Sequence, residues 1–262
     1  MRSVELSSAD LAALVARLRA AGCVFAEEEA ALLVAEAPGP AALERAVVRR
    51  VDGEPLELVL GWAEFCGLRL AVAPGVFVPR RRTELLVRTG AAGLAAGDVV
   101  VDVGCGTGAV AAALGATVPG LALHAVDVDP AAVSVARSNL PAAHVWEGDL
   151  LDPLPAHLRG RVALLAANTP YVPSEEVALM PREARDHEHR VALDGGGDGV
   201  EVQRRLLVQA PTWLAPGGRV VVETGRRQAA LTVDAARAAG LVAEVVTDDE
   251  VDGTVVVARR RP

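Results

Sequence analysis

The tetrapeptide Asn168–Tyr171 contains two hydrogen-bond acceptors, a rigid residue and an aromatic ring in direct succession. It begins where an apolar run with the composition of a buried strand ends. The Asn168 side chain and the Thr169 carbonyl suit the two hydrogens of an NH2 group. Pro170 stiffens the backbone, and Tyr171, the only tyrosine, offers a face to a planar amide or base. Asn and Pro also form ordinary turns, so neighbouring groups must decide between chemistry and a turn.

The glycine-rich segment 102–108, DVGCGTG, lies where an apolar run changes into a helical pattern. Gly104, Gly106 and Gly108 let the backbone approach a ligand and take positive φ angles. The N-terminus of the following helix favours negative charge. The glycines follow Asp102 with the spacing GxGxG, whereas a dinucleotide fingerprint has GxGxxG. Tight turns also use glycine, so this segment alone indicates a ligand site without identifying the ligand.

Carboxylates end the next two apolar runs. Asp127 lies about 20 residues beyond the glycine segment, where a carboxylate can accept both hydroxyls of a ribose. Asp129, directly before Pro130, fits a helix cap and leaves Asp127 for the sugar. Asp149 ends the third run, where its carboxylate or a main-chain N–H would meet adenine. Because the carboxyl ends of parallel strands share one edge, these groups predict a ligand that contains adenosine.

The elements that position these groups alternate between strand and helix patterns from residue 98 onward. This alternation predicts an α/β fold with a parallel, doubly wound sheet. The expected strands are 98–104, 121–129, 143–149, 161–168, 217–225, 241–248 and 253–260, and the expected helices are 108–117, 130–140, 199–214 and 226–240.

The chain before this region has a separate organisation. We expect residues 1–55 to form a small helical domain for substrate recognition, in which Leu11, Leu14, Val15 and Leu18 share one helix face. Residues 56–90 are the expected linker. Two short β runs flank 74–75 there, indicating a β-hairpin, and a helix is expected to begin near Thr83 as N-cap. Residues 91–262 form the expected catalytic domain.

Composition narrows the classes of function. The formal net charge is −8, and all 26 Lys and Arg positions are Arg. This acidic balance disfavours a nucleic-acid-binding protein. The run 80–82 is equally a local basic patch or a solvated turn. Three dispersed cysteines support neither a disulfide framework nor a zinc site, and we interpret His187 and His189 as a loop pair. No apolar run predicts a membrane helix, and we expect a cytoplasmic protein.

The glycine segment with Asp127 and Asp149 resembles the motifs of the class I methyltransferases that depend on S-adenosylmethionine. This resemblance implies a Rossmann-like sheet of seven strands that ends in an antiparallel hairpin, with S-adenosyl-L-homocysteine as product. The cofactor-binding residues that it implies are Asp102, Gly104, Cys105, Gly106, Thr107, Gly108, Asp127, Val128, Asp149, Leu150 and Asn168.

The tetrapeptide NTPY resembles the (Asn/Asp/Ser)-Pro-Pro-(Tyr/Phe/Trp) motif of amino-methyltransferases, with Thr169 at the first Pro. An amide nitrogen is a poor nucleophile because its lone pair is delocalised. If the Asn168 oxygen and the Thr169 carbonyl accept its two hydrogens, the lone pair is held toward the methyl group, and charge developing on nitrogen is stabilised. No metal and no strong base are required, since the proton can leave after transfer.

The region before the catalytic domain resembles the protein-(glutamine-N5) methyltransferases of the HemK/PrmC family, and the resemblance extends over about residues 54–262. It rests on Gly61, Glu64, Phe65, the hairpin, Pro79-Arg80 and Thr83-Glu84, and on the segment REARDHEHRVALDGGGDGVE. The family methylates the glutamine of the Gly-Gly-Gln loop of peptide-chain release factors. The resemblance implies that substrate, with Asn168, Pro170, Tyr171 and Arg80 binding it. The chain departs from the family at Thr169, at Leu150, at His189 where Pro is expected, and in a shorter N-terminal domain. These departures leave open a related protein or peptide substrate.

Three other functions remain as alternatives. An amino-methyltransferase of nucleic acid, acting on adenine N6 or cytosine N4, would use the same tetrapeptide, although the acidic charge argues against it. A dehydrogenase is disfavoured by the glycine spacing. A cofactor-binding interaction module without transfer activity would keep the pocket alone. Glu223, at the end of the fifth expected strand, either lines the cofactor pocket or caps the next helix.

Overall fold

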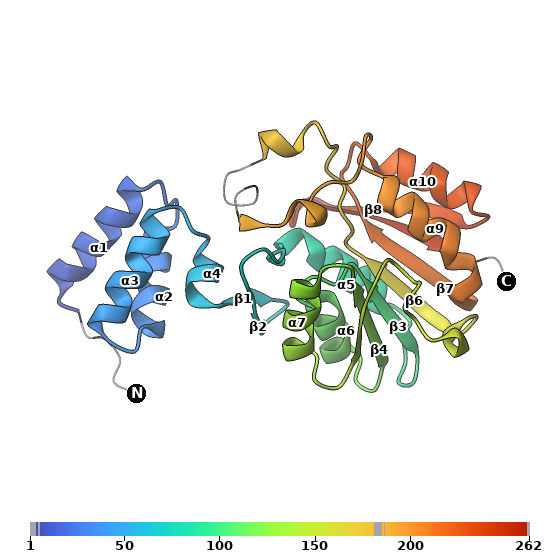
Figure 1. The fold of residues 1–262 in the computed structure, drawn as a ribbon, viewed down its shortest axis with the longest axis horizontal. Helices are drawn as coiled ribbons and strands as arrows, with labels where there is room; N and C mark the ends of the chain where they lie inside the picture. Colours follow the sequence, from blue (N-terminus) through green and yellow to red (C-terminus); the bar gives the residue numbers. More distant parts are fainter. Residues whose placement is uncertain (1–3, 5, 181–184, 186, 261–262) are drawn as a thin grey trace. The chain divides into compact units, whose positions relative to one another are not determined.

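A computed structural model describes residues 4, 6–180, 185 and 187–260 of the chain. The chain divides into two compact units, residues 1–63 and residues 64–262 (Figure 1). Each unit has its own buried apolar cluster, and each is described separately below.

The N-terminal unit consists of short helices. They are α1 (Ser8–Ala20), α2 (Ala26–Glu36), α3 (Pro40–Val51) and α4 (Leu56–Leu60). Ser7 caps α1 by accepting a hydrogen bond from Asp10 N at 3.2 Å. Of the apolar face expected on α1, Leu14 and Leu18 are buried, Val15 is partly buried and Leu11 is exposed. The expectation of a helical N-terminal segment is therefore confirmed, and its core rests on small aliphatic side chains.

The second unit is built on a seven-stranded sheet with the order β5-β4-β3-β6-β7-β9-β8 (Figure 1). The strands are β3 (Val99–Val103), β4 (Ala122–Asp127), β5 (His144–Glu147), β6 (Val162–Ala167), β7 (Leu214–Glu223), β8 (Val242–Asp248) and β9 (Gly253–Arg259). Strands β3 to β7 pair in parallel, whereas β9 pairs antiparallel with both β7 and β8. The predicted doubly wound sheet and its antiparallel end are confirmed.

Helices cover both faces of this sheet, because successive side chains of each strand point to opposite faces. Val100 and Leu164 pack with α5 (Glu84–Ala91) and α6 (Ala109–Thr117). Val101 and Leu165 pack into the cluster that includes α9 (Glu201–Trp213) and α10 (Ala229–Ala238). Figure 1 shows these two pairs of helices on opposite sides of the sheet. α7 (Pro130–Asn139) lies against β4 and β5.

Short 3-10 helices occur in the connections of this unit. They are η1 (Arg81–Thr83), η2 (Ala156–Leu158), η3 (Val177–Leu179) and η4 (Arg190–Ala192). Over the described part of the chain, every helix is too short or too polar to span a bilayer.

The β-hairpin lies earlier than the sequence predicts. It consists of β1 (Trp62–Phe65) and β2 (Leu68–Ala71). Its two turn residues, Cys66 and Gly67, have φ angles of 50° and 74°, as a tight two-residue hairpin requires. The prediction of a hairpin around 74–75 is wrong. Gly75 instead bonds to a distant segment, donating to His187 O at 3.0 Å and accepting from His189 N at 2.8 Å.

Thr83 precedes α5 but does not cap it. Its backbone is already helical, with φ −69° and ψ −13°, and its side chain makes no capping hydrogen bond. The expected N-cap role is therefore wrong, because η1 continues directly into α5. The hydroxyl of Thr83 is consequently available for the interior of the protein.

Candidate active site

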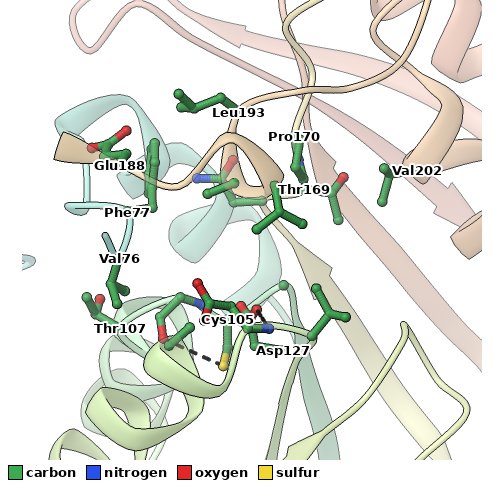
Figure 2. A pocket seen from close by; sticks show the side chains of 18 of the residues that line it. Val76, Phe77, Cys105, Thr107, Asp127, Thr169, Pro170, Glu188, Leu193 and Val202 are labelled. Atoms are coloured by element: carbon green, nitrogen blue, oxygen red, sulfur yellow. Dashed lines mark hydrogen bonds between the residues drawn. The ribbon is translucent and has the colours of Figure 1, made fainter. Parts of the chain in front are cut away.

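A cavity of about 670 Å³ lies at the carboxyl edge of the parallel strands (Figure 2). Its walls come from the segment 75–83, from the ends of β3, β4 and β6, and from the segment 188–193. This volume lies within the range of small-molecule and cofactor sites. The position agrees with the rule that open α/β sheets bind ligands beyond the carboxyl ends of their strands.

The glycine segment forms the floor of the cavity. Gly104 and Gly106 have φ angles of 68° and 53°, a conformation that strains other residues. The amides of Gly104 and Cys105 both donate to Val126 O, at 2.9 and 3.0 Å, which ties the loop to β4. Together with Thr107, these residues line the cavity as predicted for cofactor binding.

Gly108 is the one predicted cofactor residue that does not line the cavity. It is the N-cap of α6, with a φ of 77°. A Cβ atom at this position would lie 2.7 Å from Leu140 Cδ1. Its requirement for glycine therefore comes from the packing of α6 against the end of α7.

Asp127 presents a carboxylate at the cavity wall between two main-chain donors. Gly106 N donates to its Oδ2 at 2.8 Å, and Asp129 N donates to its Oδ1 at 2.9 Å. Burial raises the pKa of this carboxyl above its ordinary value. Asp129 accepts from Ala131 N at 2.9 Å, which confirms that it caps α7. The capping role leaves the Asp127 carboxylate at the cavity wall, and its predicted contact with a ribose stays a prediction.

Asp102 lies below the glycine segment, and its side chain is almost fully buried. Its Oδ2 accepts a hydrogen bond from Ala111 N at 3.0 Å, in the first turn of α6. Burial raises the pKa of this carboxyl to about 7, although the Ala111 bond opposes the shift. Asp102 is therefore an acid that ionises near neutrality at the floor of the cavity.

The remaining predicted cofactor residues line the cavity beside β4 and β5. Asp149 forms an ion pair with Arg205 of α9. Leu150 is buried with a φ of 50°, and Val128 is half exposed. Arg205 also lines the cavity, and the sequence offers no signal for it.

Asn168, Thr169, Pro170 and Tyr171 all line the cavity, on the side where β6 ends. Asn168 Nδ2 donates to Thr83 Oγ1 at 3.2 Å. Thr169 is buried, and its hydroxyl has no hydrogen-bond partner among the described residues. Tyr171 donates its hydroxyl to Glu223 Oε1 at 3.3 Å, and burial together with that carboxylate raises the Tyr171 pKa to about 12. The tetrapeptide thus faces the same space as Asp127 (Figure 2).

Arg80 lines the cavity through a network of its own. Its guanidinium donates to Glu188 Oε1 at 2.5 Å and lies over the Phe77 ring, 5.2 Å from the centroid. The same oxygen of Glu188 accepts from Val78 N at 3.3 Å. Arg80 therefore joins the segment 76–80 to the segment around Glu188. Figure 2 shows Phe77 and Glu188 on the same side of the cavity.

His189 connects the same segment to the cofactor side. Its Nδ1 lies 2.6 Å from Asp129 Oδ2. The sequence motifs contain Thr83, Glu188 and His189 but indicate no contact for any of them. The contacts join residues more than 50 positions apart, so only the fold reveals them.

Glu223 takes neither of the two places that the sequence suggests. It is the last residue of β7, it is buried, and it is not part of the cavity wall. The helix that follows begins after Gln228 and has no side-chain cap. Glu223 instead lies behind Tyr171.

The cavity also suits a nucleoside with an extended polar substituent. The Asp127 carboxylate could accept hydrogen bonds from sugar hydroxyls. The glycine backbone beside it carries no side chains, which leaves room for the polar substituent of the nucleoside. On the opposite wall, the Asn168 amide and the Tyr171 ring would face the reacting group. We therefore expect separate places for a nucleoside cofactor and for an acceptor.

Comparison with known proteins identifies relatives of the chain. Residues 67–179 match the family model described as Methyltransferase small domain. A release factor glutamine methyltransferase of Moorella thermoacetica is 38% identical over 77% of this chain and 74% of its own length. The release factor glutamine methyltransferase of Bradyrhizobium diazoefficiens is 33% identical over 100% of this chain and 92% of its own length.

Among solved structures, a methyltransferase from Pyrococcus furiosus superposes with a TM-score of 0.58. It is 17% identical to this chain, and the match covers 75% of this chain and 90% of that protein. This likeness shows the shared fold of the sheet and its helices.

Proposed function

Because this chain belongs to the family of release factor glutamine methyltransferases, we propose that it methylates the Gly-Gly-Gln loop of a peptide-chain release factor. The methyl group comes from S-adenosylmethionine and is transferred to the side-chain amide nitrogen of the glutamine. The observation that carries the proposal is the placement of the Asn168 amide in the same cavity as the Asp127 carboxylate. The first suits an NH2 group, and the second suits a ribose.

The residues of the cavity fit S-adenosylmethionine in three parts. The Asp127 carboxylate accepts hydrogen bonds from the ribose hydroxyls, while Gly106 N and Asp129 N hold it in place. The glycine segment receives the methionine part, and Asp149 with Leu150 lies on the adenine side. When bound there, the cofactor supplies a methyl group made electrophilic by its positively charged sulfur.

The acceptor side is arranged for an amide nitrogen. Asn168 has its Nδ2 bonded to Thr83, so its Oδ1 is the atom that accepts a hydrogen from the glutamine. The main-chain carbonyl of Thr169 accepts the second hydrogen, a role that is unaffected by replacing Pro with Thr. Two acceptors on one NH2 group hold its lone pair in a fixed direction and stabilise positive charge that develops on nitrogen.

The side chains of the acceptor side do not provide a strong base. The raised pKa of Tyr171, about 12, keeps its hydroxyl protonated near neutral pH, so it acts as a hydrogen-bond donor to Glu223. The Tyr171 ring contributes a flat surface for the amide. Nitrogen becomes acidic once it carries the methyl group, and its proton then leaves to water.

The remaining parts of the proposal concern partner and location. The Arg80–Glu188 pair lines the same cavity, and Arg80 is proposed to contact the protein loop that enters it. Residues 1–55 are proposed to contribute to recognition of the release factor. Release factors act at the ribosome, so the proposal places the enzyme in the cytoplasm.

The test is transfer of a labelled methyl group from S-adenosylmethionine to a purified release factor. We expect label on the wild-type loop and none when its glutamine is replaced by Ala. The Asn168→Ala enzyme should lose about 100-fold or more in kcat, as expected when one stabilising group is removed. Its melting temperature should still rise with S-adenosylhomocysteine, which shows that the cofactor site is intact. Absence of label on the wild-type loop would refute the assigned substrate.

A further inference from the structure

Two buried residues support the acceptor tetrapeptide: Thr83, which also lines the cavity, and Glu223, which does not. Thr83 ends η1 and is 2% exposed, and Glu223 ends β7 and is 1% exposed. The Thr83 hydroxyl accepts from Asn168 Nδ2 at 3.2 Å. The Glu223 carboxylate accepts from the Tyr171 hydroxyl at 3.3 Å. Each of the two therefore contacts a side chain that faces the acceptor.

These two contacts lie near one another. Burial raises the pKa of the Glu223 carboxyl, whereas the nearby Thr83 and Tyr171 hydroxyls lower it. The four residues come from the ends of β6 and β7 and from η1, so no local sequence motif contains them all.

The hydrogen bond between Asn168 and Thr83 fixes how the amide is turned. Nδ2 is the only donor of the Asn168 side chain, and it donates to the Thr83 hydroxyl. The amide is thereby held with its oxygen pointing away from Thr83. The orientation that methyl transfer requires is thus set by a residue of η1 that lies in the cavity wall.

The end of β7 that carries Glu223 is itself anchored. Gln203 of α9 donates from Nε2 to Glu223 O at 3.2 Å. Gln203 Oε1 accepts from the Thr232 hydroxyl of α10 at 2.6 Å, and both residues are completely buried. The carboxylate therefore sits on a rigid support. A rigid support is what a group needs if it is to orient another group.

We propose that Thr83 and Glu223 are positioning residues for methyl transfer. Thr83 fixes the orientation of the Asn168 amide, and Glu223 fixes the hydroxyl and hence the ring of Tyr171. Each of the two acts on the reaction through another side chain, because Thr83 accepts from Asn168 and Glu223 is not part of the cavity wall. This inference rests on the proposed glutamine methylation and adds two residues to its machinery.

The experiment compares four enzyme variants under saturating cofactor and release factor. Thr83→Val removes the hydroxyl while keeping the shape of the side chain, and Thr83→Ser restores the hydroxyl. Thr254→Val makes the same chemical change at a buried threonine of β9 that is not part of the cavity. Glu223→Gln keeps an oxygen that can accept from the Tyr171 hydroxyl.

We expect Thr83→Val to lower kcat about 10- to 100-fold, since a small misplacement of a catalytic group has effects of this size. The KM for S-adenosylmethionine and the melting shift with S-adenosylhomocysteine should stay at the wild-type values. Thr83→Ser and Glu223→Gln should keep kcat within about threefold of wild type, and Thr254→Val should not change it. This pattern separates orientation of Asn168 from general loss of packing.

Two results would overturn the inference while leaving the proposed function intact. One is an active wild-type enzyme whose kcat is unchanged in Thr83→Val. The other is a Thr83→Ser enzyme as slow as Thr83→Val, because the hydroxyl would then not be the cause. If Thr83→Val does not fold, the comparison of Thr83→Ser with Thr83→Cys, whose sulfur is a much weaker hydrogen-bond acceptor, makes the same test. An inactive wild-type enzyme would instead refute the proposed function.

Discussion

Replacing Asp102 by Asn is expected to change how the stability of the unit 64–262 depends on pH. Asp102 is almost fully buried, and its pKa in the folded protein is about 7 instead of the ordinary 3.8. The folded protein therefore keeps this proton to higher pH than the unfolded chain does. The stability that the protonated carboxyl contributes is complete below pH 4 and is lost as the pH rises through 7.

The size of the effect follows from the two pKa values. Between pH 5.5 and 7, the unfolded chain has released its proton while the folded protein still holds it. This interval spans about one and a half pH units, which corresponds to about 2 kcal/mol of unfolding free energy. Asn at this position has no proton to lose, and its oxygen can still accept from Ala111 N. The Asp102→Asn protein should therefore lack this 2 kcal/mol decrease.

The assay is urea unfolding at pH 5.5 and pH 8.5, followed by tryptophan fluorescence. Trp62 belongs to the other unit and is replaced by Phe in every variant, which leaves Trp146 and Trp213 as reporters. When the pH is raised from 5.5 to 8.5, the unfolding free energy of Asp102→Asn should increase by about 2 kcal/mol relative to that of wild type. Asp234→Asn, an exposed change on α10, serves as the control and should show no such gain. If the unfolding free energies of wild type and Asp102→Asn differ by the same amount at both pH values, the raised pKa of Asp102 is refuted.

Three further changes test other parts of the site. Gly108→Ala should destabilise the unit by about 2 kcal/mol or more in urea, because its Cβ would overlap Leu140 at a positive φ. Thr169→Val should stabilise the same unit by about 1 kcal/mol, since it removes a buried hydroxyl without a described partner, and transfer should continue because the carbonyl remains. His189→Ala should release S-adenosylhomocysteine several-fold faster in stopped-flow fluorescence, because the contact with Asp129 is lost. An unchanged release rate would show that this contact does not hold the cavity closed.

The strands and the cofactor half of the site are predictable from sequence for a physical reason. A strand buried on both faces is mostly apolar, so a change to polar residues marks where it ends, as at Asn168 after the entirely apolar β6. In a parallel sheet those ends meet at one edge, so the pattern of apolar runs is enough to predict that Asp127 and Asn168 share one cavity. Predicting that Asp127 and Asn168 lie together therefore requires no knowledge of side-chain packing.

The acceptor half is less predictable because its contacts are long-range. Asn168 and Thr83 are 85 residues apart, and Arg80 and Glu188 are 108 residues apart. Thr83 shows why a local rule fails here. A threonine before a helix favours an N-cap. At this position, however, the hydroxyl bonds to Asn168, and η1 continues directly into α5. A tertiary hydrogen bond has replaced the local one.

The position of the β-hairpin was also not predictable from residue composition alone. Pro74 and Gly75 have the composition of a turn, yet the tighter turn forms at Cys66 and Gly67. Cys is an unusual residue for a positive φ, so composition does not mark this site. Gly75 is required for another reason, because a Cβ atom there would lie 2.4 Å from the His189 ring.

We expect two departures from the family motif, His189 and Thr169, to preserve the chemistry because the backbone carries the roles concerned. His189 has a φ of −65°, the angle that Pro would impose, so the chain keeps the expected path. Unlike Pro, it adds an N–H that donates to Gly75 and an imidazole that contacts Asp129. Thr169 likewise keeps the carbonyl that the proposed reaction needs, and its side chain is buried at the cavity wall. A substitution that preserves the backbone at these two positions therefore changes how firmly the cavity is held, while the groups that orient the amide stay in place.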